Sequence, residues 1–532
     1  MGNTLNAKDG LRFGCPGCGS GLRYDIKRKT MYCDSCGQTY ILSDIEDPSA
    51  KAGDGMMEAT ECRCPQCGAA VHTSQTAITS FCTYCGADVI LSQRMIRIRR
   101  PDRIVPFSIT REQCEKIYRD KVKAARFAPE DFAAQETIDH FRPVYIPFWE
   151  YKGSVQGASA GEAVHRYSDR KYDYTDEYAF DVSGSVDVSG VIYDASLSFE
   201  DETAQHLQFS TRQAVSFHPA YLCGFYAEAP DTQPTLYEGG AEGFALRQWQ
   251  GEFAKQCGLE RARTSLPKGF STEVEMLLMP VWLLAKRDGD RVVYTAVNGN
   301  SGAIVCDTPV SNRKFGILAA EFTAVFLAAL LVLHFLFILR PRPLAGLCAV
   351  IAAVAQWVIA NAAREIEMRQ DKSNDLSWQM THGQRSAAGK AWKPRRIRWH
   401  AGWYEPLIGT AAAVGIGMFI SGLHSSGANE FVAGLVSDHG WLPTVLLCCA
   451  IGVFLLSRYK LQQSLDGLLF LLRLGMIGVL LIAQFSIVAD LSYYLFCIVL
   501  MALTVLSMLR LNRAHNLFVS RPVPFFGKEG DA

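Results

Sequence analysis

Residues 13–44 read FGCPGCGSGLRYDIKRKTMYCDSCGQTYILSD, and residues 62–93 read CRCPQCGAAVHTSQTAITSFCTYCGADVILSQ. Each stretch holds two Cys-x-x-Cys pairs and ends in an Ile-Leu-Ser tail, so the two are copies of one module. The cysteines of the first copy recur 49 residues later in the second. They are Cys15, Cys18, Cys33 and Cys36, followed by Cys64, Cys67, Cys82 and Cys85. The spacing, with 14 residues between the pairs, is close to that of zinc sites with four cysteine ligands.

The chemistry of zinc explains this pattern. Zinc prefers a tetrahedron of soft ligands, and four thiolates leave no coordination position open for water. A glycine follows the second cysteine of every pair, at a position of the turn that favours positive φ. A redox Cys-x-x-Cys motif comes singly at the start of a helix in a βαβ unit, and nothing here fits that setting. We therefore predict two zinc ribbons, at residues 13–45 and 62–92, each with a short hairpin and one structural Zn²⁺.

The charge balance disfavours a nucleic-acid partner. The 532 residues carry a formal net charge of zero, whereas nucleic-acid binders usually have a strong basic excess. Residues 1–100 hold twelve Lys and Arg against ten Asp and Glu, and two zinc–tetrathiolate centres would make this region slightly acidic. Scattered single cysteines in the rest of the chain are typical of a reducing compartment. The soluble part is therefore expected on the cytoplasmic side.

Residues 101–310 are predicted to form an α+β domain built on antiparallel sheet. Thr110 is expected to cap a helix that runs to about Phe127, with Gln113 as its capping-box partner. A second helix is expected from Glu238 to about Gly258. The stretch VEMLLMPVWLLAKRDGDRVVYTAVNGNSGAIVCD reads as three strands joined by an Asp-Gly turn and an Asn-Gly turn.

No catalytic constellation emerges from this region, so no catalytic or cofactor-binding residue is predicted and the chain is not expected to be an enzyme. The sequence has no P-loop and no His-Glu-x-x-His motif. The stretch GASAG at 157–161 lacks the strand–turn–helix setting of a nucleotide loop. Aromatic residues gather at Tyr145, Phe148, Trp149 and Tyr151, most simply as core. The acidic residues Asp173, Asp176 and Glu177 are expected in a solvated loop.

Long apolar runs dominate the last part of the chain. About 20 apolar residues are needed for one helical span. Six runs approach that length: 316–339, 344–363, 404–424, 441–457, 467–488 and 491–510. The loop at 364–401 carries nine Lys and Arg, which the positive-inside rule places in the cytoplasm. We therefore predict a transmembrane helical region at 315–512 and a tail at 513–532, with both termini cytoplasmic.

The order of these segments resembles one bacterial family, often labelled as transcription factor IIB-type zinc-ribbon proteins or, wrongly, as primosomal helicase-like. The resemblance covers residues 13–340. It is carried by the tandem knuckles, by IVPFSITREQCEKIYRDKVKAARFAPEDF and RPVYIPFWEYKG, by MPVWLL and AVNGNSGAIV, and by the membrane spans that follow. It implies that the eight cysteines are the zinc ligands. It also implies partners among phage-shock-type coiled-coil proteins and flotillin-like (SPFH-type) proteins.

The fold expected from these observations is multidomain: two tandem four-cysteine zinc ribbons, an α+β domain with antiparallel sheet, and a transmembrane bundle of about six spans. The expected function is a membrane-anchored cytoplasmic adaptor that recruits partner proteins to the bacterial inner membrane, in envelope stress. Two alternatives stay open. The first is a transporter or channel with a regulatory zinc-binding domain, and the second is a membrane-tethered nucleic-acid-binding protein. Oligomerisation is compatible with each of them.

Overall fold

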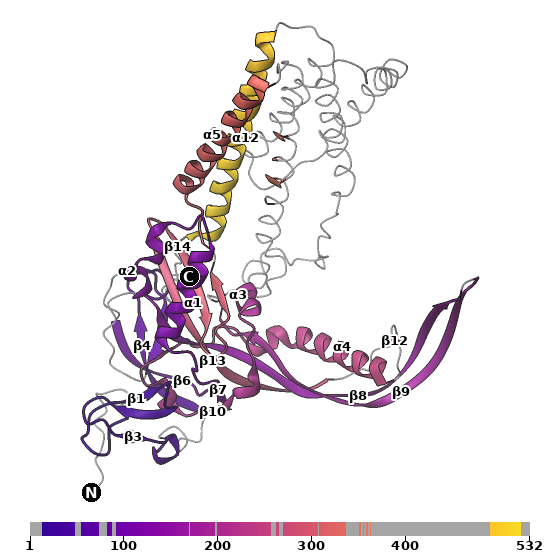
Figure 1. The fold of residues 1–532 in the computed structure, drawn as a ribbon. Helices are drawn as coiled ribbons and strands as arrows, with labels where there is room; N and C mark the ends of the chain where they lie inside the picture. The colour runs from indigo at the N-terminus through magenta and orange to yellow at the C-terminus, as the bar shows by residue number, and fades with distance from the viewer. Residues whose placement is uncertain are drawn as a thin grey trace, which may run out of the picture.

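The computed structural model describes residues 13–47, 55–73, 82–87, 92–169, 171–196, 199, 201–256, 262–264, 270–306, 308–336, 490–522 and six helical positions between 351 and 362. A β-rich body makes up most of this part (Figure 1). A long two-stranded arm extends from one side of the body, and two helices rise from its upper end, α5 (Asn312–Leu336) and α12 (Asp490–Val519).

The first cysteine module folds as a small sheet of its own. It contains β1 (Leu22–Asp25), β2 (Thr30–Cys33) and β3 (Thr39–Tyr40), which pair antiparallel in that order. The turn between β1 and β2 places Lys29 in the left-handed region, at φ 55°. The hairpin predicted between the knuckles of the first copy is therefore confirmed.

The second module is instead part of the main sheet. Its β5 (Ala70–Thr73) pairs with β4 (Met56–Arg63), which pairs in turn with β6 (Ser92–Arg99). These strands continue a 13-stranded sheet in the order β10-β7-β13-β8-β11-β5-β4-β6. The other members of that path are β7 (Arg103–Ile104), β8 (Arg142–Ser168), β10 (Val215–Ser216), β11 (Tyr226–Ala227) and β13 (Phe270–Asp288). The two copies therefore differ in their surroundings, because the second supplies a strand to the body.

The remaining strands flank this path. They are β9 (Asp173–Asp194) and β12 (Ala262–Thr264), which pair with β8, and β14 (Arg291–Asn298), β15 (Ile304–Cys306) and β16 (Arg521–Pro522). Pairing is antiparallel except between β8 and β11 and between β7 and β13. The strands β13, β14 and β15 meet at the predicted Asp-Gly and Asn-Gly turns, so that part of the prediction is confirmed.

The helices of the body agree with the sequence. α1 (Arg111–Ala124) begins after Thr110, whose hydroxyl accepts from the Gln113 backbone N–H while the Gln113 side chain accepts from the Thr110 N–H. The predicted capping box is therefore present. α4 (Glu238–Gln256) lies where the second helix was predicted. Two short helices complete the body, α2 (Gln135–Ile138) and α3 (Asp201–His206).

Aromatic side chains form the centre of the core. Phe107 is fully buried and contacts the rings of Phe225, Tyr145 and Trp282 at centroid distances of 4.8, 5.0 and 5.5 Å. A Cβ on Gly299, in the Asn-Gly turn, would come within 2.4 Å of the Phe107 ring, so glycine is required there by packing. The four aromatic residues predicted as core, from Tyr145 to Tyr151, are all at most 2% exposed.

The predicted six-span transmembrane bundle is wrong. Among the described residues, one helix is long and apolar enough to cross a membrane, Cys497–Val519 within α12. The runs at 404–424, 441–457 and 467–488 lie outside the described residues, as does most of 344–363. Hydropathy counts apolar residues over a window, but a span also needs one continuous helix of that length. Within the described residues, the structure therefore supports one candidate span and not a bundle of six.

The predicted multi-pass topology in the bacterial inner membrane, with both termini cytoplasmic, is overturned by the same finding. Its orientation depended on six spans, because the number of crossings decides which loops share a side. One candidate helix in the described part of the chain does not define such a topology. Most strands of the described residues belong instead to one large sheet.

Candidate metal centre

Each Cys-x-x-Cys-Gly segment forms the same tight turn. The glycine N–H donates to the carbonyl of the first cysteine of the pair, at 2.8 Å for Gly19, 2.9 Å for Gly37 and Gly68, and 3.0 Å for Gly86. All four glycines have positive φ, between 64° and 80°, as predicted from their place in the sequence. This turn directs both sulfurs of a pair to one side, which a metal site requires.

The turns bring the eight cysteines together in two groups of four. The first group is Cys15, Cys18, Cys33 and Cys36, and the second is Cys64, Cys67, Cys82 and Cys85. Within each group the sulfur atoms all lie within 4.8 Å of one another, and all eight thiols are free. The structure therefore contains two clusters that could each hold a metal ion.

The sulfur separations fit a tetrahedral metal rather than disulfides. Sγ–Sγ distances are 3.5 Å for Cys15–Cys36 and for Cys18–Cys33. They are 3.8 Å for Cys64–Cys85 and 3.7 Å for Cys67–Cys82. Metal–sulfur bonds of about 2.3 Å in a tetrahedron place the sulfurs about 3.8 Å apart. A disulfide would need about 2.05 Å.

The two groups differ in exposure. In the first group Cys18 and Cys36 are exposed, whereas all four cysteines of the second group are buried. The second group lies in a hydrophobic cluster with sheet residues such as Val144 and Leu283. A Cβ on Gly86 would come within 2.9 Å of the Ala285 carbonyl on β13, which shows how closely this knuckle approaches the sheet.

Neighbouring groups adjust the thiols before any metal binds. Cys82 Sγ lies beside Cys67, and the hydrogen bond from that thiol lowers the pKa of Cys82 to about 5. The Tyr84 backbone N–H also donates to Cys82 Sγ, at 3.4 Å. In the first group, the hydroxyl of Tyr40 lies 3.4 Å from Cys15 Sγ and lowers the pKa of Cys15 to about 6. Both shifts favour the thiolate, which is the form that binds metal.

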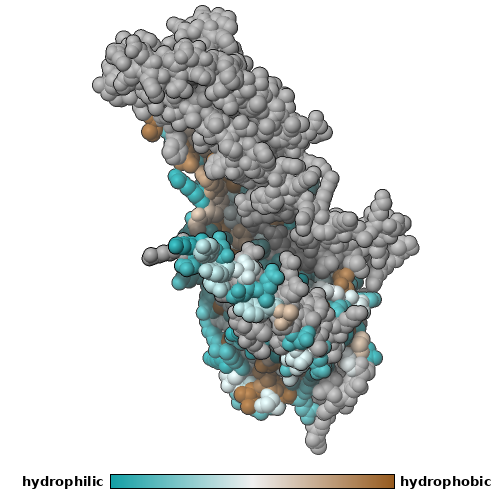
Figure 2. Space-filling model, turned by 90° about the vertical axis from the view of Figure 1, so that its right-hand side faces the viewer, coloured by the Kyte–Doolittle hydropathy of each residue, from teal (hydrophilic) through white to brown (hydrophobic). Residues whose placement is uncertain are grey.

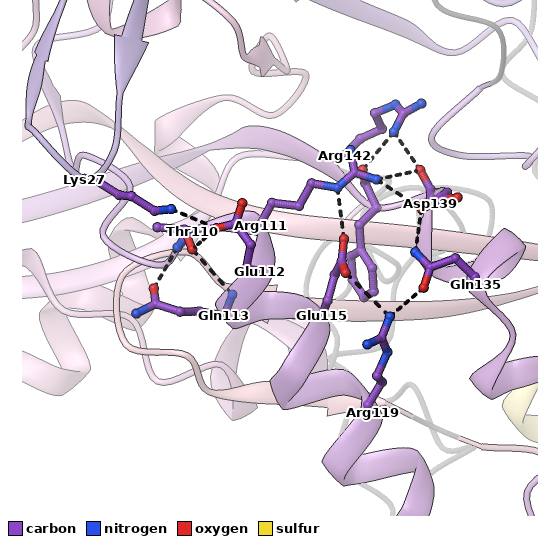
Figure 3. Close-up of polar contacts among 11 residues, drawn as sticks. Lys27, Thr110, Arg111, Glu112, Gln113, Glu115, Arg119, Gln135, Asp139 and Arg142 are labelled. Carbon is purple, nitrogen blue, oxygen red and sulfur yellow. Dashed lines mark hydrogen bonds and ion pairs between the residues drawn. The ribbon is translucent and has the colours of Figure 1, made fainter.

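Polar contacts attach the first module to the body (Figure 3). The Lys27 ammonium on the β1–β2 turn pairs with Glu112 at 3.4 Å, and Glu112 also accepts from the Thr110 hydroxyl. On the same side, the Tyr24 N–H donates to the Cys223 carbonyl at 3.1 Å. These contacts reach across from β1 to the start of α1 and fix the hairpin in place.

A cavity of about 540 Å³ lies at this junction, between β1, the start of α1 and the beginning of β8. Its lining includes the cations Arg23, Lys27, Arg111 and Arg142 and the acids Asp25 and Glu112. Carboxylates engage these cations: Asp34 pairs with Arg23, Glu112 with Lys27, and Glu115 with Arg111. Figure 3 shows the Lys27–Glu112 and Arg111–Glu115 pairs. The cavity wall is therefore a largely neutralised network rather than a strong anion site.

The described residues do not assemble a catalytic constellation around either cluster. The stretch GASAG, which spells Gly-x-Ser-x-Gly, lies inside β8 and not at a strand-to-helix turn. A tetracysteine site that is saturated by protein ligands has no open position for a substrate. The contacts of Tyr40 and Tyr84 with the sulfurs were not predicted from the sequence. Each of these tyrosines lies within four residues of a cysteine in the repeat.

Comparison with known proteins gives one informative match. No family model matches the chain, and no solved structure matches it. The Bacillus subtilis (strain 168) protein described as uncharacterized protein YdjG is 30% identical over 340 residues. The match covers 98% of that protein and 60% of this chain. The chain belongs to the same protein family as this Bacillus subtilis protein.

Proposed function

We propose that the chain is an adaptor whose two tetracysteine groups each hold a structural Zn²⁺ and whose β-rich body presents a docking surface for partner proteins. The observation that carries this proposal is the second group, in which four buried cysteines close a site inside the hydrophobic core of the sheet. A metal in that position stabilises the body and has no access to a substrate. A scaffold role accounts for both centres at once.

Zinc is the metal that this ligand set favours. Tetrahedral sites with four sulfurs select zinc or iron, and zinc is the usual choice where the module is a small structural knuckle. Zinc binding supplies folding free energy to modules too small to hold a core. The first module has that character, because its sheet contains three short strands.

The purified full chain should contain two zinc ions, and a strong chelator should remove them in two phases. The first phase should empty the first group, because Cys18 and Cys36 are exposed to the chelator. The second phase should be slower, because the buried second group opens only when the sheet opens. Elemental analysis gives the stoichiometry, and a zinc-sensitive dye follows release with time.

Matched variants assign the phases. Cys36→Ser should abolish the fast phase and leave the slow one, whereas Cys114→Ser, a buried cysteine outside both groups, should change neither. Release in a single phase would contradict the different accessibility of the groups. A visible iron–thiolate absorption in place of zinc would contradict the assignment of the metal.

The adaptor role is tested with the partner classes that the family resemblance implies. Full-length chain is co-expressed with a phage-shock-type coiled-coil protein or with a flotillin-like protein, and each complex is purified through either partner. Stable co-purification in both directions, with cross-links to the β-rich body, is the expected result. If neither class binds, and purified chain instead binds DNA or RNA in a salt-sensitive way, the adaptor proposal gives way to nucleic-acid binding.

Membrane attachment enters the proposal only through α12. Its residues Leu495 and Ile498 are 61% and 66% exposed, which leaves an apolar surface near the start of the helix. The foot of the helix is fixed to the sheet, because Arg291 Nε donates to the Ser520 hydroxyl and Asn516 Nδ2 donates to the Val310 carbonyl at 2.9 Å. Flotation of the full chain with lipid vesicles, weakened by Leu495→Asn with Ile498→Asn, would support attachment by this helix.

A further inference from the structure

The arm is a hairpin of unusual reach. β8 has 27 residues and β9 has 22, and their register continues without a break from Gly153–Val188 to Ser168–Asp173 at the tip. β13 stops pairing with β8 at Val155, and β12 covers three residues further out. In the described part of the chain, β9 pairs with β8 alone. Its outer edge therefore offers backbone donors and acceptors to another strand.

The core of the body does not extend along the arm. At its base α4 packs on the hairpin, where Trp249, Val155 and Val188 are at most 1% exposed. Beyond this point the described side chains of β9 are nearly all exposed. Figure 1 shows the distal arm projecting past the end of α4. A two-stranded ribbon without a core is marginally stable in water, so a further strand would stabilise it.

Tyrosines gather at the end of the arm. Tyr172, Tyr174 and Tyr178 are 66%, 39% and 49% exposed. The ring of Tyr174 stacks on that of Tyr167 at a centroid distance of 5.0 Å. The ring of Tyr172 contacts the ring of Tyr174 edge-on, at a centroid distance of 6.4 Å. Tyrosine supplies much of the binding free energy at protein interfaces, because its large ring loses little conformational entropy on binding. The cluster is therefore suited to contact a partner.

Charge decides which partner fits. β9 contains no lysine or arginine and carries Asp173, Asp176, Glu177, Asp181 and Asp187, which outnumber the neighbouring basic residues Arg166, Arg170 and Lys171. Pairing with β9 of a second copy would bring these acids together, and an anionic lipid surface would repel them. Figure 2, which faces the side toward which the arm points, shows hydrophilic residues with separate hydrophobic patches on the described surface.

We propose that the outer edge of β9, with the tyrosines of the arm tip, is the docking site for an arginine- and lysine-rich segment of a partner protein. The segment adds to β9 in extended conformation, so that main-chain hydrogen bonds give affinity and alternate side chains give specificity. Arginine suits both features of the site, because its guanidinium stacks on tyrosine rings and pairs with carboxylates. This inference rests on the proposed adaptor function and names its contact surface.

The test uses the full chain and a defined probe, a fluorescent peptide of alternating arginine and threonine. Its affinity is measured by fluorescence anisotropy. Asp173→Lys with Glu177→Lys, and separately Tyr174→Ser with Tyr178→Ser, should each weaken binding by about tenfold or more. The matched control is Asp288→Lys with Asp290→Lys, which reverses two exposed acids in the β13–β14 turn and should leave the affinity unchanged.

Two further peptides separate strand addition from charge attraction. An N-methylated peptide carries methyl groups on every second residue, and it is made in two versions, on the odd or on the even residues. Both versions keep their charge and lose half of their main-chain donors. The version that loses the donors facing β9 should bind about tenfold more weakly. A peptide with glutamate in place of arginine should not bind. Equal losses for the arm and turn variants, or no effect of N-methylation in either register, would overturn the inference and leave the acids as a solubilising edge.

The outcome is separable from that of the adaptor proposal. If arm variants lose the peptide and also the co-purified partner, both proposals stand. If the arm variants still bind the peptide and still co-purify with the partner, the arm is not the docking site and the adaptor role survives. Concentration-dependent dimerisation of the full chain, abolished by the β9 charge reversal, would show that a second copy occupies the edge and would also overturn the inference.

Discussion

Replacing Cys82 with serine should unfold the β-rich body and not only the second cysteine module. Cys82 is buried, and its group lies in the cluster that contains β8 and β13 side chains. A structural zinc contributes about 10 kcal/mol or more to folding, and the net stability of a domain is only about 5–15 kcal/mol. Circular dichroism and limited proteolysis should show loss of the sheet signal and of any resistant fragment.

The first module provides the comparison. Cys33→Ser should unfold that module and destabilise the body less than Cys82→Ser does. Its three strands form a separate sheet, but side chains such as Leu22 and Tyr24 pack into a core cluster that also contains Phe107. A resistant fragment that begins after the first module should survive proteolysis. If Cys82→Ser keeps two zinc ions and melts with the parent, the second group is not part of the core. If Cys33→Ser removes the whole sheet signal, the modules are not independent.

Replacing Phe107 with alanine should cost about 3–5 kcal/mol, the range for removal of a buried phenylalanine ring. Phe107 is fully buried and contacts three other aromatic rings, from β8, β13 and the segment before β11. Its removal leaves a cavity that these ring neighbours cannot close without moving the strands. Chemical denaturation of the full chain, followed by tryptophan fluorescence, should show the midpoint moving to lower denaturant.

Phe244→Ala is the matched control, because Phe244 lies on α4 and is 44% exposed. Its loss should change the midpoint little. Equal shifts for the two variants would show that ring burial at Phe107 does not dominate the stability of the body. A further check on this part of the core is Gly299→Ala. It should destabilise the chain, because the added Cβ would overlap the Phe107 ring.

Features formed by residues close together in the sequence were predicted correctly. The cysteine spacing and the following glycines define the four turns, because a knuckle is closed by residues within five positions of one another. The Thr110–Gln113 capping box and the Asp-Gly turn depend on equally short ranges. The aromatic residues from Tyr145 to Tyr151 were read as core because so much apolar area stabilises the fold only when it is buried.

The sequence predicted strand in HFRPVYIPFWEYKGSVQG and in YAFDVSGSVDVSGVIYDASLSF, but it did not predict that the two strands pair into a long projecting arm. Asp173, Asp176 and Glu177 were expected in a loop, yet they lie in β9, where an exposed two-stranded ribbon needs no alternation of apolar residues. The aromatic and acidic pattern at 172–178 is visible in the sequence, but its projection from the body is not. The six-span prediction was wrong for a different reason. It inferred membrane-spanning helices from apolar composition alone.

The sequence by itself determined the two tetracysteine groups, since turn geometry and ligand chemistry act over a few residues. Only the tertiary structure decided that they differ. The second copy adds β5 to the main sheet and buries all four sulfurs, whereas the first copy keeps a separate sheet with two exposed cysteines. Strand pairing between β5 and β11 joins residues more than 150 positions apart, and no local pattern encodes such a contact. The hairpin pairing of β8 with β9 sets the reach of the arm and leaves the outer edge of β9 that we assign to a partner.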